Sequence, residues 1–266
     1  TPDGVRLRYT DRGAGDDAIV LVHGWKGSHR LWDQVVARLE PRHRVVAFDL
    51  RGMGESDKPK GRYDFDELSD DLAFVLGELG LRDVTLVGWS MGCTVSLRHM
   101  ERGGAGVARL VLLNGPLRLV RTDDFPEAMS AEQLDGYLED LAANWPASER
   151  AFQAEAHLDP DGELAEWAYR IALQTPLPIA LQVVREQARL DMREAVRGLR
   201  VPVLAAYSTR DPYYPVSLGE WIARTAPDGR LAVFEGSAHG TPVEEPAALA
   251  DAIEAFVSAT PAGARA

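Results

Sequence analysis

The sequence predicts an α/β fold: a mostly parallel central sheet flanked by helices, with a helical segment inserted before the last strands. Three observations support it. Strand and helix signals alternate over the first 115 residues, and most of the strand signals are short continuous apolar runs. Residues 116–197 contain helical signals without a convincing strand, and the alternation then resumes. Continuous apolar strands that alternate with helices are typical of parallel sheets covered on both faces.

The first part of the chain supplies most of the expected strands. A helix is expected to begin at Asp64, because Glu67 follows at the spacing of a capping box, and to end at Gly80. In chain order, we expect an edge strand over 5–11, a strand over 18–24, a helix over 31–40, a strand over 43–49, a helix over 64–80, a strand over 83–88, a helix over 91–102 and a strand over 108–114. Ligand sites in such sheets lie at the carboxyl ends of the strands.

The segment over 116–197 is too long for a simple connection and too apolar for disorder. Helical stretches over 130–145, 162–174 and 179–196 predict a cap packed on the sheet, so the expected division is a core of 1–115 and 198–266 with a cap of 116–197. After the cap, we expect a strand over 201–208, a helix over 216–226, a strand over 230–236, a helix over 245–259 and a frayed tail over 260–266.

Composition excludes several classes of function. The 266 residues carry a net charge of −12 and no basic stripe, which argues against a nucleic-acid partner. No apolar run reaches the roughly 18 residues needed to span a membrane. The first residues lack the pattern of a secretory signal, so a cytoplasmic protein is expected. The chain does not begin with Met, which leaves the native N-terminus open, and nothing in the sequence indicates the oligomeric state.

Cysteine and histidine usage gives no sign of a disulfide or a metal. The single cysteine, Cys93, lies among apolar residues of an expected helix and is interpreted as a small buried hydrophobic residue rather than a nucleophile. The six histidines lack metal-ligand spacing. We therefore expect no structural metal and no cofactor.

The pentapeptide Gly88-Trp89-Ser90-Met91-Gly92 joins a buried strand to a helix. By itself the Gly-x-Ser-x-Gly pattern is weak support for catalysis, but this setting is typical of a nucleophile elbow. The glycines keep side chains out of a tight turn, and the hydroxyl is held at a helix N-terminus, where negative charge is favoured. Ser90 is therefore predicted to be a nucleophile rather than part of an ordinary turn.

A serine nucleophile needs a base, and the base needs an acid to orient it. His239 follows the strand expected over 230–236, and Asp211 follows the strand expected over 201–208. Each alone could be an ordinary loop residue. Three such residues at strand ends, in the order Ser, Asp, His, predict the catalytic residues Ser90, Asp211 and His239.

An oxyanion hole is expected from the loop that follows the strand over 18–24. Gly24 lets the backbone turn there, and we predict the backbone N–H groups of Trp25 and Met91 as the two donors. The side chain of His23 is interpreted as a brace for the loop.

Together these motifs resemble α/β-hydrolase-fold enzymes over essentially the whole chain. The matching stretches are HGW, FDLRGMGESDKP, GWSMG, the D-x-x-x-P that begins at Asp211, and GSAH with a downstream EEP. The chain is most similar to the small bacterial esterase, lactonase and cofactor-free haloperoxidase (perhydrolase) branch. This resemblance implies a helical cap inserted after the sixth strand and a structural role for Asp49 and Arg51.

Two departures from other branches bear on the chemistry. Haloalkane dehalogenases use an Asp nucleophile, whereas this chain has Ser90. Some cofactor-independent oxygenases place the acid after the strand that ends here at 113, but Asn114 occupies that position, which favours Asp211.

The expected reaction is hydrolysis of a small apolar or aromatic carboxylic ester or lactone through an acyl-enzyme on Ser90. Its partner would be a small-molecule substrate. Two alternatives stay open: an acyltransferase that uses the same intermediate, and a ligand-binding module on a hydrolase scaffold. The expected pocket residues are Trp25, Trp145, Trp167 and Tyr213, although cap aromatics could instead pack the cap onto the core.

Overall fold

The computed structural model describes residues 1–15, 17–126 and 128–260. In these residues, seven strands form one sheet in the order β1-β3-β2-β4-β5-β6-β7, and only β1 runs antiparallel to its neighbour. The strands are β1 (Tyr9–Arg12), β2 (Ala18–Val22), β3 (Arg44–Phe48), β4 (Val84–Trp89), β5 (Val107–Leu113), β6 (Val203–Ser208) and β7 (Gly229–Phe234). The predicted fold class is confirmed.

Helices cover both faces of the sheet because the strand side chains alternate between two hydrophobic clusters. Val20 and Val22 of β2 belong to the cluster that includes residues of α2, α3 and α9, whereas Ile19 and Leu21 belong to the cluster that includes residues of α1 and α11. The core helices are α1 (Asp33–Leu39), which follows the 3-10 turn η1 (His29–Trp32), α2 (Phe65–Glu78), α3 (Met91–Glu101), α8 (Arg193–Arg197), α9 (Val216–Thr225), α10 (Thr241–Glu244) and α11 (Pro246–Ala259).

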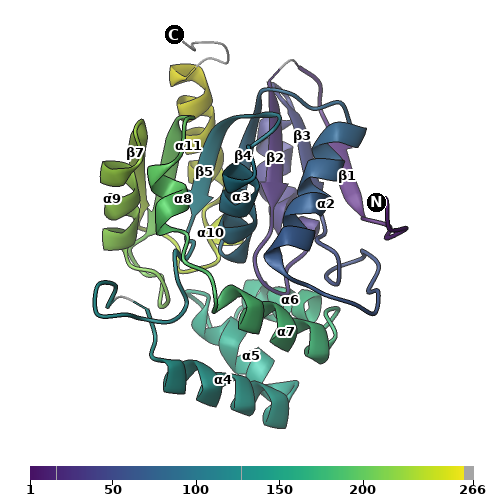
Figure 1. Cartoon of the computed structure of the whole chain (residues 1–266), viewed down its shortest axis with the longest axis vertical. Helices are drawn as coiled ribbons and strands as arrows, with labels where there is room; N and C mark the ends of the chain where they lie inside the picture. Colours follow the sequence, from purple (N-terminus) through teal and green to yellow (C-terminus); the bar gives the residue numbers. More distant parts are fainter. Residues whose placement is uncertain (16, 127, 261–266) are drawn as a thin grey trace.

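Four helices lie together at one end of the sheet, beyond the carboxyl ends of the parallel strands (Figure 1). They are α4 (Ala131–Asn144), α5 (Ala147–Glu155), α6 (Glu163–Ala172) and α7 (Leu177–Gln187). They follow β5, the fifth strand of this chain, and not the sixth, because only β1 precedes β2 along the chain. The assignment of 116–197 as a separate cap stays a prediction, and α8 within that range contacts the core helices α3 and α9.

Three local expectations were wrong. Helix α5 was missed because Phe152 is its one large apolar side chain. The single helix expected over 179–196 is two helices, α7 and α8, and between them the Asp191 carboxylate accepts a hydrogen bond from the N–H of Arg193 at 3.1 Å. The edge strand begins at Tyr9 rather than at residue 5, because the N–H groups of Arg6 and Arg8 donate to loop side chains at 56–57.

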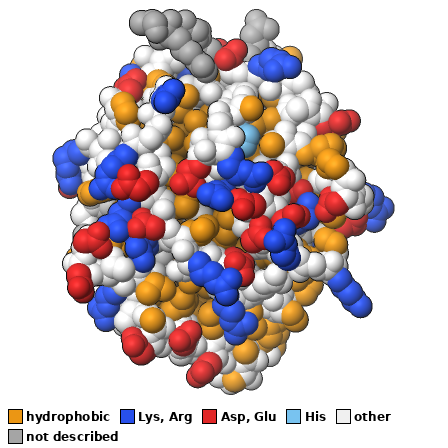
Figure 2. Space-filling model, in the orientation of Figure 1, with side chains coloured by type: hydrophobic (Ala, Val, Ile, Leu, Met, Phe, Trp, Pro, Cys, Tyr) orange, Lys and Arg blue, Asp and Glu red, His pale blue; other side chains and the backbone are white. Residues whose placement is uncertain are grey.

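The short helix α10 was not expected, because it lies within a loop of the expected structure. The other elements agree with the expected ones to within a few residues, and the Asp64 carboxylate caps α2 as expected. The frayed tail expected over 260–266 lies outside the described residues apart from Thr260. Within the described part of the chain, every helix falls short of the length and apolarity that a membrane crossing requires. On the face drawn in Figure 2, acidic and basic side chains are interspersed over the middle of the molecule.

Candidate active site

Ser90 occupies a strained turn between β4 and α3. Its backbone has φ 55° and ψ −121°, a left-handed conformation that residues with side chains rarely adopt. The N–H of Ser90 donates to the carbonyl oxygen of Leu113 at 2.9 Å, which ties the turn to β5. The turn therefore places the hydroxyl above the sheet, at the start of α3.

The glycines on either side allow this turn because there is no room for a side chain at either position. A Cβ on Gly88 would lie 2.5 Å from the carbonyl oxygen of Gly92. A Cβ on Gly92 would overlap the carbonyl oxygen of Val22 and would lie 2.8 Å from that of His23. All the atoms that would be overlapped belong to the backbone, so α3 can approach β2 this closely only with glycine at position 92.

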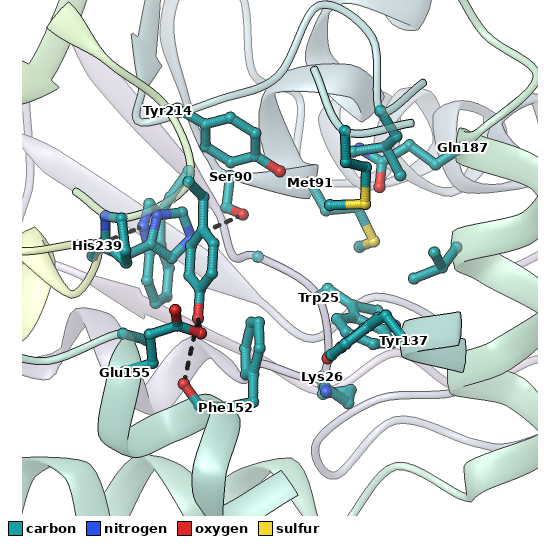
Figure 3. A pocket seen from close by; sticks show the side chains of 18 of the residues that line it. Trp25, Lys26, Ser90, Met91, Tyr137, Phe152, Glu155, Gln187, Tyr214 and His239 are labelled. Atoms are coloured by element: carbon teal, nitrogen blue, oxygen red, sulfur yellow. Dashed lines mark hydrogen bonds between the residues drawn. The ribbon is translucent and has the colours of Figure 1, made fainter. Parts of the chain in front are cut away.

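Ser90, His239 and Asp211 form a continuous hydrogen-bonded chain, of which Figure 3 shows the contact between His239 and Ser90. The Nε2 atom of His239 lies 3.0 Å from the Oγ atom of Ser90, and its Nδ1 atom lies 2.8 Å from the Oδ2 atom of Asp211. The other carboxylate oxygen, Oδ1, accepts the backbone N–H groups of Tyr213 at 2.8 Å and Tyr214 at 3.2 Å. The Asp211 side chain is fully buried, so both of its oxygens are fixed by the protein.

The sheet brings the three residues together. Asp211 follows β6 and His239 follows β7, and these strands are hydrogen-bonded neighbours. The indole N–H of Trp89, the residue before Ser90, donates to the carbonyl oxygen of His239 at 2.9 Å. The serine turn and the histidine loop are thereby held to each other.

Asn114 at the end of β5 is a bridge between loops. Its side-chain N–H donates to the hydroxyl of Thr241 at 2.9 Å, and its oxygen accepts the N–H of Ser208 at 2.9 Å. It therefore links the end of β6 to the loop that carries His239, while Asp211 holds the position next to the imidazole ring.

The loop after β2 lies against Ser90. A Cβ on Gly24 would approach the Cβ of Ser90 to 3.0 Å. His23 braces this loop as expected: its Nδ1 atom donates to the carbonyl oxygen of Gly24 at 2.7 Å, and its Nε2 atom accepts the N–H of Leu50 at 3.0 Å. Burial lowers the pKa of His23, which keeps the ring neutral and leaves Nε2 able to accept.

Two backbone donors border the same space. Among the described residues, the N–H groups of Trp25 and Met91 have no hydrogen-bond partner. Met91 is the first residue of α3, where no carbonyl of the helix can accept its N–H. Both residues line a cavity together with Ser90. This arrangement suits a site that stabilises negative charge on an oxygen bound at Ser90.

The cavity has a volume of about 600 Å³ and lies between the sheet and helices α4, α5 and α7. Aromatic rings form much of the wall near the imidazole. The ring of Phe152 stacks on Tyr213 at 5.3 Å, Tyr213 packs edge-on against His239 at 5.1 Å, and Trp25 meets Phe152 at 5.8 Å. In the described parts of the chain, no group of three or more His, Cys, Asp or Glu side chains is arranged to hold a metal ion.

Two of the four residues expected at a substrate pocket lie at the cavity wall. Trp25 and Tyr213 line the cavity, but Trp145 and Trp167 do not. Trp167 turns the other way on α6 and packs against the hydrophobic cluster beneath α1 and α11. Trp145 is the half-buried residue that ends α4. Trp167 therefore fits the alternative interpretation, in which aromatic residues of this segment pack onto the core.

Several lining residues were not predicted. They are Lys26, Tyr137, Glu155, His157 and Gln187. All of these except His157 are labelled in Figure 3. Burial lowers the pKa of Lys26 to about 8, and the neighbouring carboxylate of Glu149 opposes this shift. A charged residue directly after the expected oxyanion donor Trp25 was a usable signal for Lys26, whereas Tyr137, Glu155, His157 and Gln187 had no such signal in the sequence.

A family model described as the alpha/beta hydrolase fold matches residues 17–246. The chain belongs to the α/β-hydrolase fold family. This hydrolase is 32% identical over 251 residues to the non-heme chloroperoxidase CPO-A1 of Kitasatospora aureofaciens, with 90% of each chain covered. It is 28% identical to the bifunctional esterase/perhydrolase DCH of Acinetobacter calcoaceticus, with 97% of this chain and 98% of that protein covered.

Solved structures agree with this assignment. An esterase from Exiguobacterium antarcticum superimposes with a TM-score of 0.90 at 25% identity, and the match covers 96% of this chain and 97% of that chain. The predicted membership of the small bacterial esterase and haloperoxidase branch is confirmed, and the protein is a hydrolase.

Proposed function

We propose that this hydrolase cleaves a small apolar or aromatic carboxylic ester or lactone through an acyl-enzyme on Ser90. The observation that carries the proposal is the hydrogen-bonded chain from Ser90 through His239 to Asp211. Its Ser90 end lines a partly aromatic cavity with Trp25 and Met91, whose backbone N–H groups have no partner among the described residues. A hydroxyl, a base and oxyanion donors at one point are the parts that acyl transfer requires.

The mechanism follows from the atoms available. Nε2 of His239 takes the proton of the Ser90 hydroxyl as Oγ attacks the carbonyl carbon. The N–H groups of Trp25 and Met91 stabilise the oxyanion that develops, and Asp211 stabilises the imidazolium. The imidazolium then protonates the leaving alkoxide. A water molecule, activated by the same nitrogen, attacks the acyl-enzyme and releases the acid.

The substrate class is proposed from the wall of the cavity. Phe152, Tyr213 and Trp25 offer ring faces and edges to the cavity that Ser90 also lines, which favours an apolar or aromatic group on at least one side of the ester. One relative is named an esterase/perhydrolase, and a solved neighbour is named an esterase. The small-molecule substrate and the cytoplasmic location stay predictions.

The test follows release of nitrophenol from p-nitrophenyl acetate and butyrate, together with the intact mass of the protein. The wild type should release nitrophenol steadily, and Ser90→Ala should lose this activity. Ser217→Ala, which removes an exposed hydroxyl on α9, is the matched control and should behave as the wild type does.

Other outcomes would point elsewhere. A stoichiometric acyl adduct that persists in water would contradict hydrolysis and favour an acyltransferase. Tight ligand binding with negligible turnover that Ser90→Ala leaves unchanged would favour a binding module. The relatives and the solved structure carry the names of a chloroperoxidase, an esterase/perhydrolase and an esterase, which support neither alternative.

A further inference from the structure

A fully buried ion pair joins the loop after β2 to the cap. The ammonium group of Lys26 contacts the carboxylate of Glu149 in α5, and both side chains have 0% exposure. Burying a charge is costly unless it is paired and hydrogen-bonded. A pair buried at this cost beside the cavity therefore calls for a functional explanation.

The surroundings complete the enclosure of the pair. The Nζ atom of Lys26 lies 3.4 Å from the ring centre of Trp25 and 4.5 Å from that of Phe152, so aromatic faces cover the cation. The second oxygen of Glu149 accepts a hydrogen bond from Nε2 of Gln153 at 2.8 Å. Figure 3 shows Lys26 close to Trp25 at the cavity wall.

The backbone at Lys26 is strained. Residues 24–27 form a turn closed by a hydrogen bond from the N–H of Gly27 to the carbonyl oxygen of Gly24 at 3.0 Å. Lys26 is the third residue of this turn and has φ 58°, a conformation that favours glycine or asparagine there. A strained residue persists where the surrounding contacts hold it in place. His23 braces the start of the turn at Gly24, and the side chain of Lys26 itself is held by the ion pair with Glu149.

We propose that Lys26 and Glu149 form a positioning pair that keeps the turn 24–27, and with it the N–H of Trp25, in place to receive the oxyanion. The inference rests on the proposed function, because it assigns the pair a role in that reaction. Neither side chain needs to touch the reacting atoms. The pair acts through the backbone of Trp25, the residue next to Lys26.

Helix α5 also holds the loop that carries His239. The carbonyl oxygen of Ala156, directly after α5, accepts the N–H groups of His239 at 3.1 Å and Gly240 at 3.2 Å. Glu149, near the start of the helix, reaches the oxyanion turn. One helix therefore fixes the oxyanion turn and the imidazole loop relative to each other.

The test separates positioning from stability. Replacing a buried ion pair by apolar side chains of similar volume is often neutral for stability, whereas removing one partner leaves an unpaired buried charge. The variants are Lys26→Met, Glu149→Gln and the double variant Lys26→Met/Glu149→Met. The matched control is Glu166→Gln, which breaks the partly exposed pair between Arg150 of α5 and Glu166 of α6.

The measurements are kcat and KM for p-nitrophenyl butyrate, thermal unfolding, and the affinity for phenylboronic acid, which forms a tetrahedral adduct on a serine hydroxyl. We expect the double variant to fold and its kcat to fall about 10- to 100-fold, less than or comparable to the loss of an oxyanion donor. KM should change by less than about threefold, and boronate affinity should fall by a factor similar to that of kcat. The Glu166→Gln control should match the wild type in all three measurements.

A folded double variant with wild-type kcat and boronate affinity would overturn the proposal and leave the pair a purely structural role. If Lys26→Met does not fold, Glu149→Gln decides the question, because it keeps the shape and the acceptor oxygen while removing the charge. A wild type that neither hydrolyses the ester nor binds the boronate would overturn the proposed function, and this inference with it. An active wild type with unaffected variants would overturn the positioning role alone.

Discussion

Replacing Asp211 by asparagine should place the wrong tautomer on His239. The Oδ1 atom of Asp211 accepts two backbone N–H groups, from Tyr213 and Tyr214. An asparagine oxygen must take that place, because an NH2 group there would face two donors. The NH2 group then takes the place of Oδ2, which lies 2.8 Å from Nδ1 of His239, and points at that nitrogen. Nδ1 must accept, so Nε2 carries the proton and cannot take one from Ser90.

The magnitude follows from losing the base while the rest of the site stays in place. Without a base for Ser90, kcat should fall about 10³- to 10⁴-fold, which corresponds to about 4 to 5.5 kcal/mol of transition-state stabilisation. KM should change little, because the cavity wall is unaltered. The assay is steady-state hydrolysis of p-nitrophenyl butyrate, with thermal unfolding to establish that the variant is folded.

The control for this variant is Asp228→Asn, which changes an exposed aspartate beside β7 and should leave kcat unchanged. A folded Asp211→Asn protein that keeps more than about a tenth of the wild-type kcat would refute the tautomer argument.

Three further predictions concern the fold around the site. Cys93 should resist alkylation by iodoacetamide in the native protein and react once urea unfolds it, because burial raises the pKa of its thiol; rapid native labelling would contradict its burial. Burial lowers the pKa of His23, His99 and His157 below 6.5, so below that pH the unfolded chain takes up protons that the native state does not. The free energy of unfolding should therefore decrease as the pH falls from 6.5 to about 5, by at most about 1.4 kcal/mol per pH unit for each histidine; urea titrations that give a constant value would oppose this. Gly92→Ala should lower the free energy of unfolding by about 1 to 3 kcal/mol or more, since its Cβ would overlap backbone atoms of β2, whereas Gly77→Ala, at a helix position with open space around it, should not destabilise. Equal urea midpoints for the two variants would show that α3 can move away from β2.

Much of the candidate site could be predicted because its residues are marked by local sequence and by the rules of parallel sheets. Ser90 lies in a short motif at a strand–helix junction, and Asp211 and His239 each follow a strand. Parallel strands end at the same edge of the sheet, so these residues had to lie near one another. The structure places the three in one hydrogen-bonded chain.

The helices within residues 116–197 were harder to predict for a physical reason. Helical periodicity identifies an apolar face but does not indicate whether that face meets the core, another helix or a cavity. Trp167 was expected at the cavity and packs on the core instead, while Tyr137 on α4 lines the cavity. Helix α5 carries too few apolar residues to be recognised as a helix, although it touches both halves of the site.

The sequence alone thus determined the sheet, its carboxyl edge and the residues presented there, because these depend on short-range patterns and on chain topology. Tertiary structure decided the wall of the cavity and the partner of Lys26. Glu149 lies 123 residues further along the chain, and no local pattern relates the two positions. Their pairing follows from how α5 packs over the turn at 24–27, where a buried ammonium group is stabilised beside a buried carboxylate.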